Sequence, residues 1–200
     1  MDKKSQIIRI CLVAVWLACV FSFMVTASRR STASSSSKDR KILMVKEVSG
    51  YKSWTRVNPV PLLLPTPLDA LCRMPTSRDL IETSSNPHRR KYFTVYVNDL
   101  GRSAMMNEAK PSFPKNTVIV KEKLIARDSN SPELLTVMVK RGEGFNPASG
   151  DWEYMVLNGT GTKIEGSGKL QNCQSCHVLN KSTDYVFRSY LPDDVRSRLR

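Results

Sequence analysis

The residues with the clearest chemistry are two cysteines and a histidine near the C-terminus, in the run Cys173-Gln174-Ser175-Cys176-His177. Two thiols at this spacing can add to both vinyl groups of a haem, and the adjacent imidazole can then bind the iron as an axial ligand. The motif therefore predicts one covalently bound haem c. Cys173, Cys176 and His177 are the expected cofactor-binding residues, and His177 is the expected metal ligand.

Two other uses of a Cys-x-x-Cys pair are less consistent with the sequence. A zinc site needs a second pair of ligands, and outside the motif and the N-terminal segment the chain offers only Cys72 and His88. A thioredoxin-like dithiol would open a helix after a buried strand, whereas this motif follows a Gly-rich stretch, 159–168. Cys72 is then a single thiol, for which a small buried apolar residue is the usual role and a reactive thiol the alternative.

The N-terminus has the pattern of an export signal. Basic residues precede an apolar run over residues 10–25, and the small residues Val25 and Ala27 would allow cleavage after Ala27. The run is also close to the lower length limit of a membrane-spanning helix. Residues 1–27 are thus expected to be a signal peptide or, through residues 10–27, an inner-membrane anchor. Either use predicts a periplasmic, exported protein, as covalent haem attachment requires.

The remaining chain predicts a linker followed by one domain. Residues 28–45 are rich in Ser and basic residues and are expected to be a flexible linker. Residues 46–200 are enough for a single haem c domain. The formal net charge is +13, of which +11 remains after the first 27 residues, with their one acid and three bases. Because export makes nucleic acid an unsuitable partner, we expect none; an acidic cytochrome or cupredoxin, an anionic membrane, or solvent alone would suit this surface.

Short runs of β-branched and aromatic residues in the middle of the chain predict strands. They cover residues 92–97, 117–124, 134–140 and 152–157. Turn-forming Pro, Gly, Asn and Asp residues separate them, which favours an antiparallel sheet. Helical patterns are weaker and cover residues 68–74 and 103–108, and the cysteine motif is expected to begin a helical turn. The sequence therefore predicts a mainly β (α+β) fold with a few short helices.

From about Tyr51 to Leu191 the chain resembles the cytochrome P460 family. The matching pieces are Trp54 and residues 94–97, 113–122, 150–152, 173–177 and 183–187. The resemblance implies an antiparallel β fold, often a homodimer, around one c-type haem. It also implies that His177 is the proximal ligand and that the distal side of the iron is open. In P460 members proper, a lysine of the T-V-x-V-K-E strand is covalently linked to the haem, and that lysine corresponds to Lys121.

Strand alternation places Ile119, Lys121 and Lys123 on one face of the sheet. If that face lines the haem, Lys121 lies among apolar groups, loses its proton more readily and becomes a nucleophile. The other interpretation of residues 121–123 is a solvated strand end with alternating charge. The resemblance favours a Lys121 that faces the haem.

Two positions differ from the family members that oxidise hydroxylamine. Those members carry an Arg just before the T-V-Y-V strand, where this chain has Phe93. They carry an acidic residue before the V-K pair of a later strand, where this chain has Thr136. Thr136 cannot accept a proton at neutral pH. Phe93 would be an apolar distal cap that favours small neutral ligands, as in the gas-binding cytochromes c′-β, which lack the cross-linking lysine. A shift in register would bring Arg89, Arg90 or Glu133 to these places.

Three functions follow from this pattern. The first, favoured by Lys121, is a haem oxidoreductase acting on hydroxylamine or a related small nitrogen compound. The second, favoured by Phe93 and Thr136, is an NO- or CO-binding sensor or scavenger. The third is an electron-transfer cytochrome, which would need a strong sixth ligand. His88 and Met138 are the candidates for that ligand, although a solvated His and a core-filling Met are the commoner roles.

Overall fold

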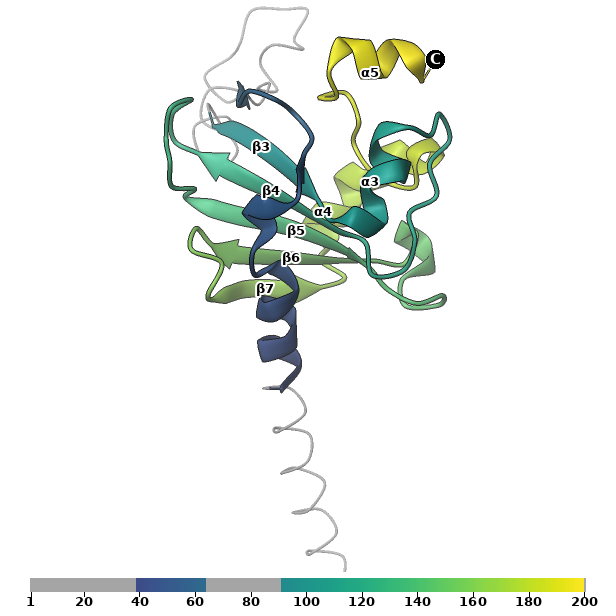
Figure 1. Cartoon of the computed structure of the whole chain (residues 1–200). Helices are drawn as coiled ribbons and strands as arrows, with labels where there is room; N and C mark the ends of the chain where they lie inside the picture. The colour runs from purple at the N-terminus through teal and green to yellow at the C-terminus, as the bar shows by residue number, and fades with distance from the viewer. Residues whose placement is uncertain (1–38, 64–90, 200) are drawn as a thin grey trace, which may run out of the picture. The chain divides into compact units, whose positions relative to one another are not determined.

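The computed structural model describes residues 39–63 and 91–199 (Figure 1). The chain divides into two units, Met1–Met44 and Val45–Arg200. The second unit is built on an antiparallel sheet, which in the described residues has seven strands in the order β1-β3-β4-β5-β6-β7, with β2 also paired to β3. The strands are β1 Thr55–Arg56, β2 Leu62–Leu63, β3 Tyr92–Val97, β4 Val118–Leu124, β5 Leu134–Lys140, β6 Trp152–Asn158 and β7 Ile164–Gly168.

All four predicted strands are present. β3 and β5 begin and end at the predicted residues, β4 begins one residue later than predicted, and β6 ends one residue later. The mainly β, antiparallel fold is therefore confirmed. The sequence does not predict β7, because this edge strand has Ile164 as its one large apolar residue and alternates between half-buried and exposed positions. Because β7 precedes α4, the cysteine motif follows a strand, as a thioredoxin-like motif would. β7 is, however, an edge strand with exposed positions and not a buried strand.

The helices are short and lie before, between and after the strands along the chain. They are η1 Tyr51–Ser53, α3 Asp99–Met106, η3 Pro147–Ser149, α4 Gln171–His177, η4 Val178–Thr183 and α5 Asp193–Arg198. The predicted helix at 103–108 is α3, which begins earlier because the Asn98 side chain caps it and accepts a hydrogen bond from the Gly101 nitrogen. The predicted turn at the cysteine motif is α4. The predicted helix at 68–74 lies outside the described residues.

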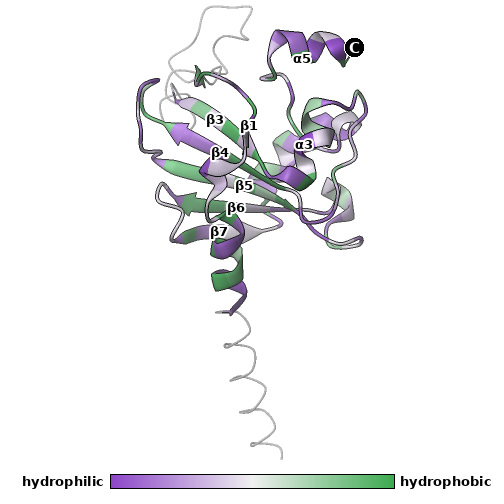
Figure 2. Cartoon of the chain, in the orientation of Figure 1, coloured by the Kyte–Doolittle hydropathy of each residue, from purple (hydrophilic) through white to green (hydrophobic). Residues whose placement is uncertain are grey.

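Residues 39–48 are also helical and overlap the end of the predicted flexible linker, 28–45. The earlier part of that linker lies outside the described residues, and the domain boundaries stay a prediction. The physical reason for the helix is that apolar side chains recur at helical spacing from Ile42 to the buried Val48. Figure 2 shows hydrophobic residues along the strands, whereas α5 is mostly hydrophilic. In the described residues, we find no helix with the length and apolar character needed to cross a membrane.

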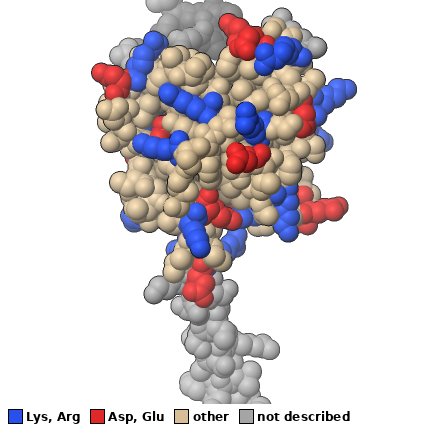
Figure 3. Space-filling model, viewed as in Figure 1, with Lys and Arg blue, Asp and Glu red and all other residues tan. Residues whose placement is uncertain are grey.

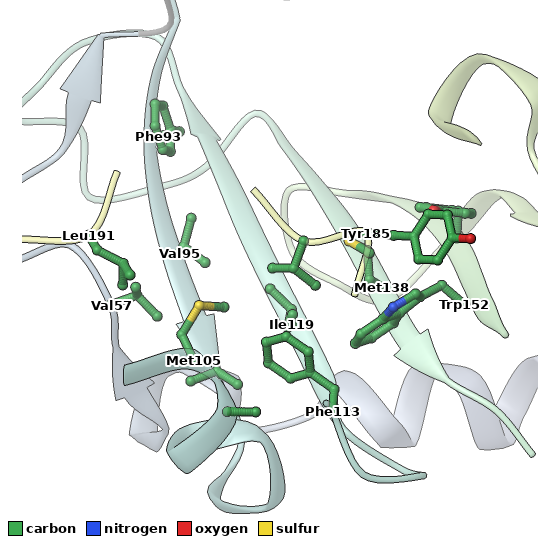
Figure 4. Packing of buried hydrophobic residues seen from close by; sticks show 14 of the residues in the cluster. Val57, Phe93, Val95, Met105, Phe113, Ile119, Met138, Trp152, Tyr185 and Leu191 are labelled. Carbon is green, nitrogen blue, oxygen red and sulfur yellow. The ribbon is translucent and has the colours of Figure 1, made fainter. Parts of the chain in front are cut away.

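A cluster of buried hydrophobic side chains lies on one face of the sheet (Figure 4), and further buried apolar residues, such as Val120, Leu135 and Leu157, lie on the other face. In the cluster of Figure 4, Phe113 packs edge-on against Trp152 with ring centroids 5.5 Å apart, Met105 of α3 and Ile119 lie beside this pair, and Phe93 lies at the other end. Gly101 allows α3 to approach closely, because a Cβ at this position would lie 2.4 Å from a methyl carbon of Thr117. The face with this cluster also carries Lys121 and is called the lysine face below.

The opposite face carries Glu122 and Glu153 and is called the carboxylate face. The Tyr51 hydroxyl donates a 2.6 Å hydrogen bond to Glu122. Glu153 is completely buried and accepts a 2.6 Å hydrogen bond from Arg141, which also pairs with Glu47 at 2.7 Å. In the view of Figure 3, Lys and Arg side chains are interspersed with Asp and Glu. Glu122 and Glu153, the two buried carboxylates of this face, are therefore each stabilised by a partner within the protein.

Candidate functional site

The sheet register brings the three candidate side chains to one face. Val95 of β3 pairs with Lys121 of β4, and Lys121 pairs with Thr136 of β5. Phe93 pairs with Lys123, two residues along the same strands. Because side chains alternate along a strand, Phe93, Lys121 and Thr136 all lie on the lysine face. Sequence alternation predicts this arrangement for β4, and the pairing extends it to the neighbouring strands.

His177 ends α4, and a backbone carbonyl fixes its orientation. Its Nδ1 lies 2.7 Å from the carbonyl oxygen of Tyr185. Because a carbonyl oxygen only accepts hydrogen bonds, Nδ1 must carry the proton, and the lone pair is left on Nε2. The imidazole also contacts two aromatic rings, with centroids 5.3 Å away at Tyr154 and 4.9 Å away at Phe187. His177 is therefore held as a neutral ligand with one nitrogen available.

The turn that supplies this carbonyl is itself held in place. Asp184 and Tyr185 both have left-handed backbone conformations, with φ of 51° and 64°. The Asp184 carboxylate accepts hydrogen bonds from Lys140 Nζ, at 2.6 and 2.7 Å, and from the Phe113 nitrogen, at 2.9 Å. Its carbonyl accepts one from Trp152 Nε1 at 2.8 Å. These contacts stabilise an uncommon backbone conformation at the point where it orients His177.

The Tyr185 ring is placed by a glycine. At Gly150, which has φ of 60°, a Cβ would lie 2.5 Å from that ring. Glycine is thus required both by the backbone conformation of the Gly150-Asp151 turn and by the close approach of the aromatic ring.

The two cysteines and His177 fit a c-type haem. Cys173 and Cys176 are one helical turn apart on α4, and Cys173 packs against the core of the lysine face while Cys176 is exposed. Burial raises the pKa of the Cys173 thiol, with Cys176 adding to the effect, which is the opposite of the low pKa of a thioredoxin-like thiol. Burial lowers the pKa of His177, and the charge of Lys121 lowers it further, while the bond to Tyr185 raises it. The donor set is that of a neutral imidazole beside two thiols.

Lys121 is a half-buried cation among apolar and like-charged neighbours. Its Nζ lies 4.5 Å from the centre of the Phe93 ring. Burial lowers its pKa to about 8, and the charge of Lys123 contributes in the same direction. Among the described residues, no carboxylate forms an ion pair with Lys121. Its surroundings are thus those of a desolvated lysine, and the solvated strand end is the less suitable description of its side chain.

The remaining candidates divide between the core and the undescribed part of the chain. Met138 is buried in the core cluster beside Ile119, which is the core-filling role. Cys72 and His88 lie outside the described residues, as do Arg89 and Arg90. Glu133 forms an ion pair with Lys91. In the part of the chain that the structure describes, no group of three His, Cys, Asp or Glu residues could hold a metal ion.

Several residues of the site carry no prediction from the sequence alone. The Thr183–Phe187 segment resembles the family pattern, yet its role in holding His177 through Asp184 and Tyr185 depends on backbone contacts that no residue type signals. Tyr154 and Tyr190 are further examples. Tyr190 packs edge-on against Phe93 with centroids 5.8 Å apart, and its only sequence signal is an aromatic residue shortly after the matched motif.

A β domain with two cysteines and a histidine arranged for a haem has a match among known protein families. The cytochrome P460 family model matches residues 76–188, more than half of the chain. The chain belongs to the cytochrome P460 family, and membership implies haem as its cofactor. Comparison with curated proteins gives no match.

Proposed function

We propose that this protein is an exported c-type mono-haem oxidoreductase that acts on hydroxylamine or a related small nitrogen compound. The observation that carries the proposal is that two side chains at the lysine face have the orientation and surroundings that a haem ligand and a reactive amine need. One is His177, whose proton is fixed on Nδ1 by Tyr185. The other is Lys121, which lies beside Phe93 without a carboxylate partner among the described residues.

Cys173 and Cys176 would hold the haem by two thioether bonds, and His177 Nε2 would bind its iron. The bound haem supplies an iron that binds a small ligand and transfers single electrons. The chain's own groups then set the conditions around it. Tyr185 keeps the imidazole in one tautomer, and the apolar Phe93 excludes water and charged ligands from its side of the site.

Lys121 has the chemical character that a reaction with the cofactor would need. A pKa of about 8 leaves roughly one molecule in ten with a neutral amine at pH 7, compared with fewer than one in a thousand for an ordinary lysine. A neutral amine is the nucleophilic form. This supports a covalent link between Lys121 and the haem, as the family resemblance implies. In that link the Lys121 nitrogen would replace a haem meso hydrogen, a two-electron oxidation that requires an external oxidant such as a peroxide.

Electrons would leave to an acidic cytochrome or cupredoxin. Directly after His177, η4 exposes two apolar side chains, Val178 at 46% and Leu179 at 81%. Lys169 and Lys181 lie close to them in sequence, and no acidic residue occurs from 166 to 183. An apolar patch with basic neighbours, next to the haem-binding motif, suits a transient partner with an acidic rim.

The second candidate is a protein that binds NO or CO. The contact between Phe93 and Tyr190 favours it, because two aromatic rings beside Lys121 leave this side of the site mainly apolar. Thr136 also supplies no acid–base group for substrate oxidation. Periplasmic location belongs to the proposal under either function.

One experiment separates these candidates. The chain is produced with a c-haem maturation system, and the reduced absorption spectrum is recorded together with the masses of haem-bound peptides. A red-shifted Soret band, with the Lys121 peptide attached to haem beside the Cys173–Cys176 peptide, supports the oxidoreductase. An ordinary five-coordinate c-type spectrum with Lys121 free supports gas binding. A protein without covalent haem contradicts both.

A further inference from the structure

Tyr190 is a polar residue of the site that no sequence motif assigns, and it follows the segment matched by the family. Its position is fixed from both sides. The Arg188 guanidinium donates hydrogen bonds to the carbonyl oxygens of Met105, at 2.9 Å, and Glu108, at 2.7 Å. On the other side Leu191 is buried in the core cluster (Figure 4). The backbone at Tyr190 is therefore held against α3 and the core.

The ring and the hydroxyl of Tyr190 have different surroundings. The ring packs edge-on against Phe93, with centroids 5.8 Å apart and an interplanar angle of 79°. Phe93 in turn contacts Lys121 Nζ. Among the described residues, the Tyr190 hydroxyl makes no hydrogen bond, and the residue is half-buried. The hydroxyl is not fully buried, since among the described residues the buried polar side-chain atom without a partner is Thr117 Oγ1, so the Tyr190 hydroxyl can reach a small molecule.

The ionisation state of this hydroxyl is clear at neutral pH. Burial raises the pKa of Tyr190, and the nearby Arg188 charge only partly opposes this effect. The phenol therefore remains protonated and can donate a hydrogen bond, but it cannot act as a base.

We propose that the Tyr190 hydroxyl donates a hydrogen bond to the small ligand bound at the haem site and so sets which ligands the site prefers. The inference rests on the proposed function, because it requires a haem with an open position. It supplies the hydrogen-bonding group that the side chain of Phe93 lacks. Ligands with a polar N–O bond, such as NO and hydroxylamine, gain from such a donor more than CO does.

The test uses the haem-loaded protein and the variant Tyr190→Phe, which removes one oxygen and keeps the ring that packs against Phe93. CO and NO are the probes. We expect the C–O stretching frequency of bound CO to rise in the variant, because the donor no longer polarises the ligand, and NO to dissociate about five- to tenfold faster. Tyr51→Phe, on the carboxylate face, is the matched control and should change neither quantity.

A measurement on the unaltered protein makes the test independent of how well the variant folds. If the Tyr190 hydroxyl contacts the ligand, the C–O band should shift when H₂O is replaced by D₂O. An unshifted band, or identical CO and NO behaviour in Tyr190→Phe, would overturn the role of Tyr190 and leave the proposed function intact. A haem-loaded protein that binds neither CO nor NO would instead overturn the open site, and the proposed function with it.

Discussion

Neighbouring residues of β4 place opposite charges on the two faces of one sheet, and the two charges have different surroundings. On the carboxylate face, Glu122 accepts a 2.6 Å hydrogen bond from Tyr51 and has Lys52 at 3.8 Å. On the lysine face, Lys121 has an aromatic ring at 4.5 Å and a like charge from Lys123. Buried charges are normally paired. The carboxylate face is thus a completed structural layer, whereas on the lysine face the described residues leave Lys121 without a carboxylate partner, as the proposed cofactor site requires.

The same contrast holds for the residues that support each face. Glu153 and Arg141 on the carboxylate face satisfy each other within the protein. On the other side, the network of Asp184 and Tyr185 serves to leave one nitrogen of His177 without a protein partner in the described residues. The charges of the carboxylate face are therefore satisfied within the protein, whereas the lysine face combines the core cluster with groups that suit a bound cofactor. Variants on each face should have different consequences.

The largest effect is expected from His177→Gly. The variant should retain covalent haem through Cys173 and Cys176 but lose the axial imidazole, so that the absorption spectrum changes completely. Haem-bound peptide masses and the reduced spectrum are the measurements, and Tyr51→Phe should keep the spectrum of the unaltered protein. A His177→Gly protein with an unchanged spectrum would show that another residue is the proximal ligand.

A carboxylate introduced on the lysine face should create the acid–base group that the site lacks. Thr136→Glu places it opposite Lys121 in the sheet register, and we expect hydroxylamine oxidation to rise about 100-fold. Thr136→Gln has the same size without the charge and should give little change. The measurement is the rate per haem with an artificial electron acceptor. Equal rates in both haem-loaded variants would mean that Thr136 does not face the substrate.

The sequence was sufficient to predict the four long strands and the haem-binding motif, because both depend on local residue type and spacing. Lys121 followed from alternation together with the family resemblance. The sequence does not predict the orientation of His177, because this orientation depends on the backbone carbonyl of Tyr185. Every residue has such a carbonyl, so no residue type signals the contact. β7 was missed because an exposed edge strand requires few apolar residues. Tyr190 was missed because its contact with Phe93 joins residues far apart in the chain.

Lys121 should reduce the stability of protein made without haem, as in the double variant Cys173→Ser/Cys176→Ser. Its pKa is about 8 when folded and about 10.5 when unfolded. The unfolded chain therefore binds more protons between these values, and stability rises with pH across that window. At pH 7, Lys121→Met in this background should increase the free energy of unfolding by about 2 kcal/mol.

That gain should shrink to near zero by about pH 11, where the lysine is neutral in both states. Urea unfolding at several pH values is the measurement. Lys110→Met, which removes an exposed lysine, is the matched control and should stay within about 0.5 kcal/mol of the parent. A Lys121→Met variant that behaves like this control would mean that Lys121 is solvated, and the lysine face would lose its main distinction from the other face.

The smallest effect is expected on the carboxylate face. Tyr51→Phe removes the hydroxyl that donates to Glu122 and should reduce the free energy of unfolding by about 1 kcal/mol. Burial, followed by the bond to Glu122, raises the pKa of Tyr51 above its usual value of 10.0. The contribution is therefore fully present below about pH 10 and decreases above it, because the unfolded chain then loses a proton that the folded protein keeps.

Urea unfolding between pH 7 and 11 measures this dependence, with Tyr92→Phe as the control, because the described contact of Tyr92 is between its ring and Arg127. In the haem-free background, the Tyr51 contribution to stability falls with pH, whereas the cost of Lys121 is relieved by the same change. Opposite slopes from the two faces are expected when one strand carries a paired carboxylate, Glu122, and a cation, Lys121, that has no carboxylate partner among the described residues. If Tyr51→Phe instead left the stability unchanged at pH 7, Glu122 would be solvated and the carboxylate face would not be the closed layer that its contacts indicate.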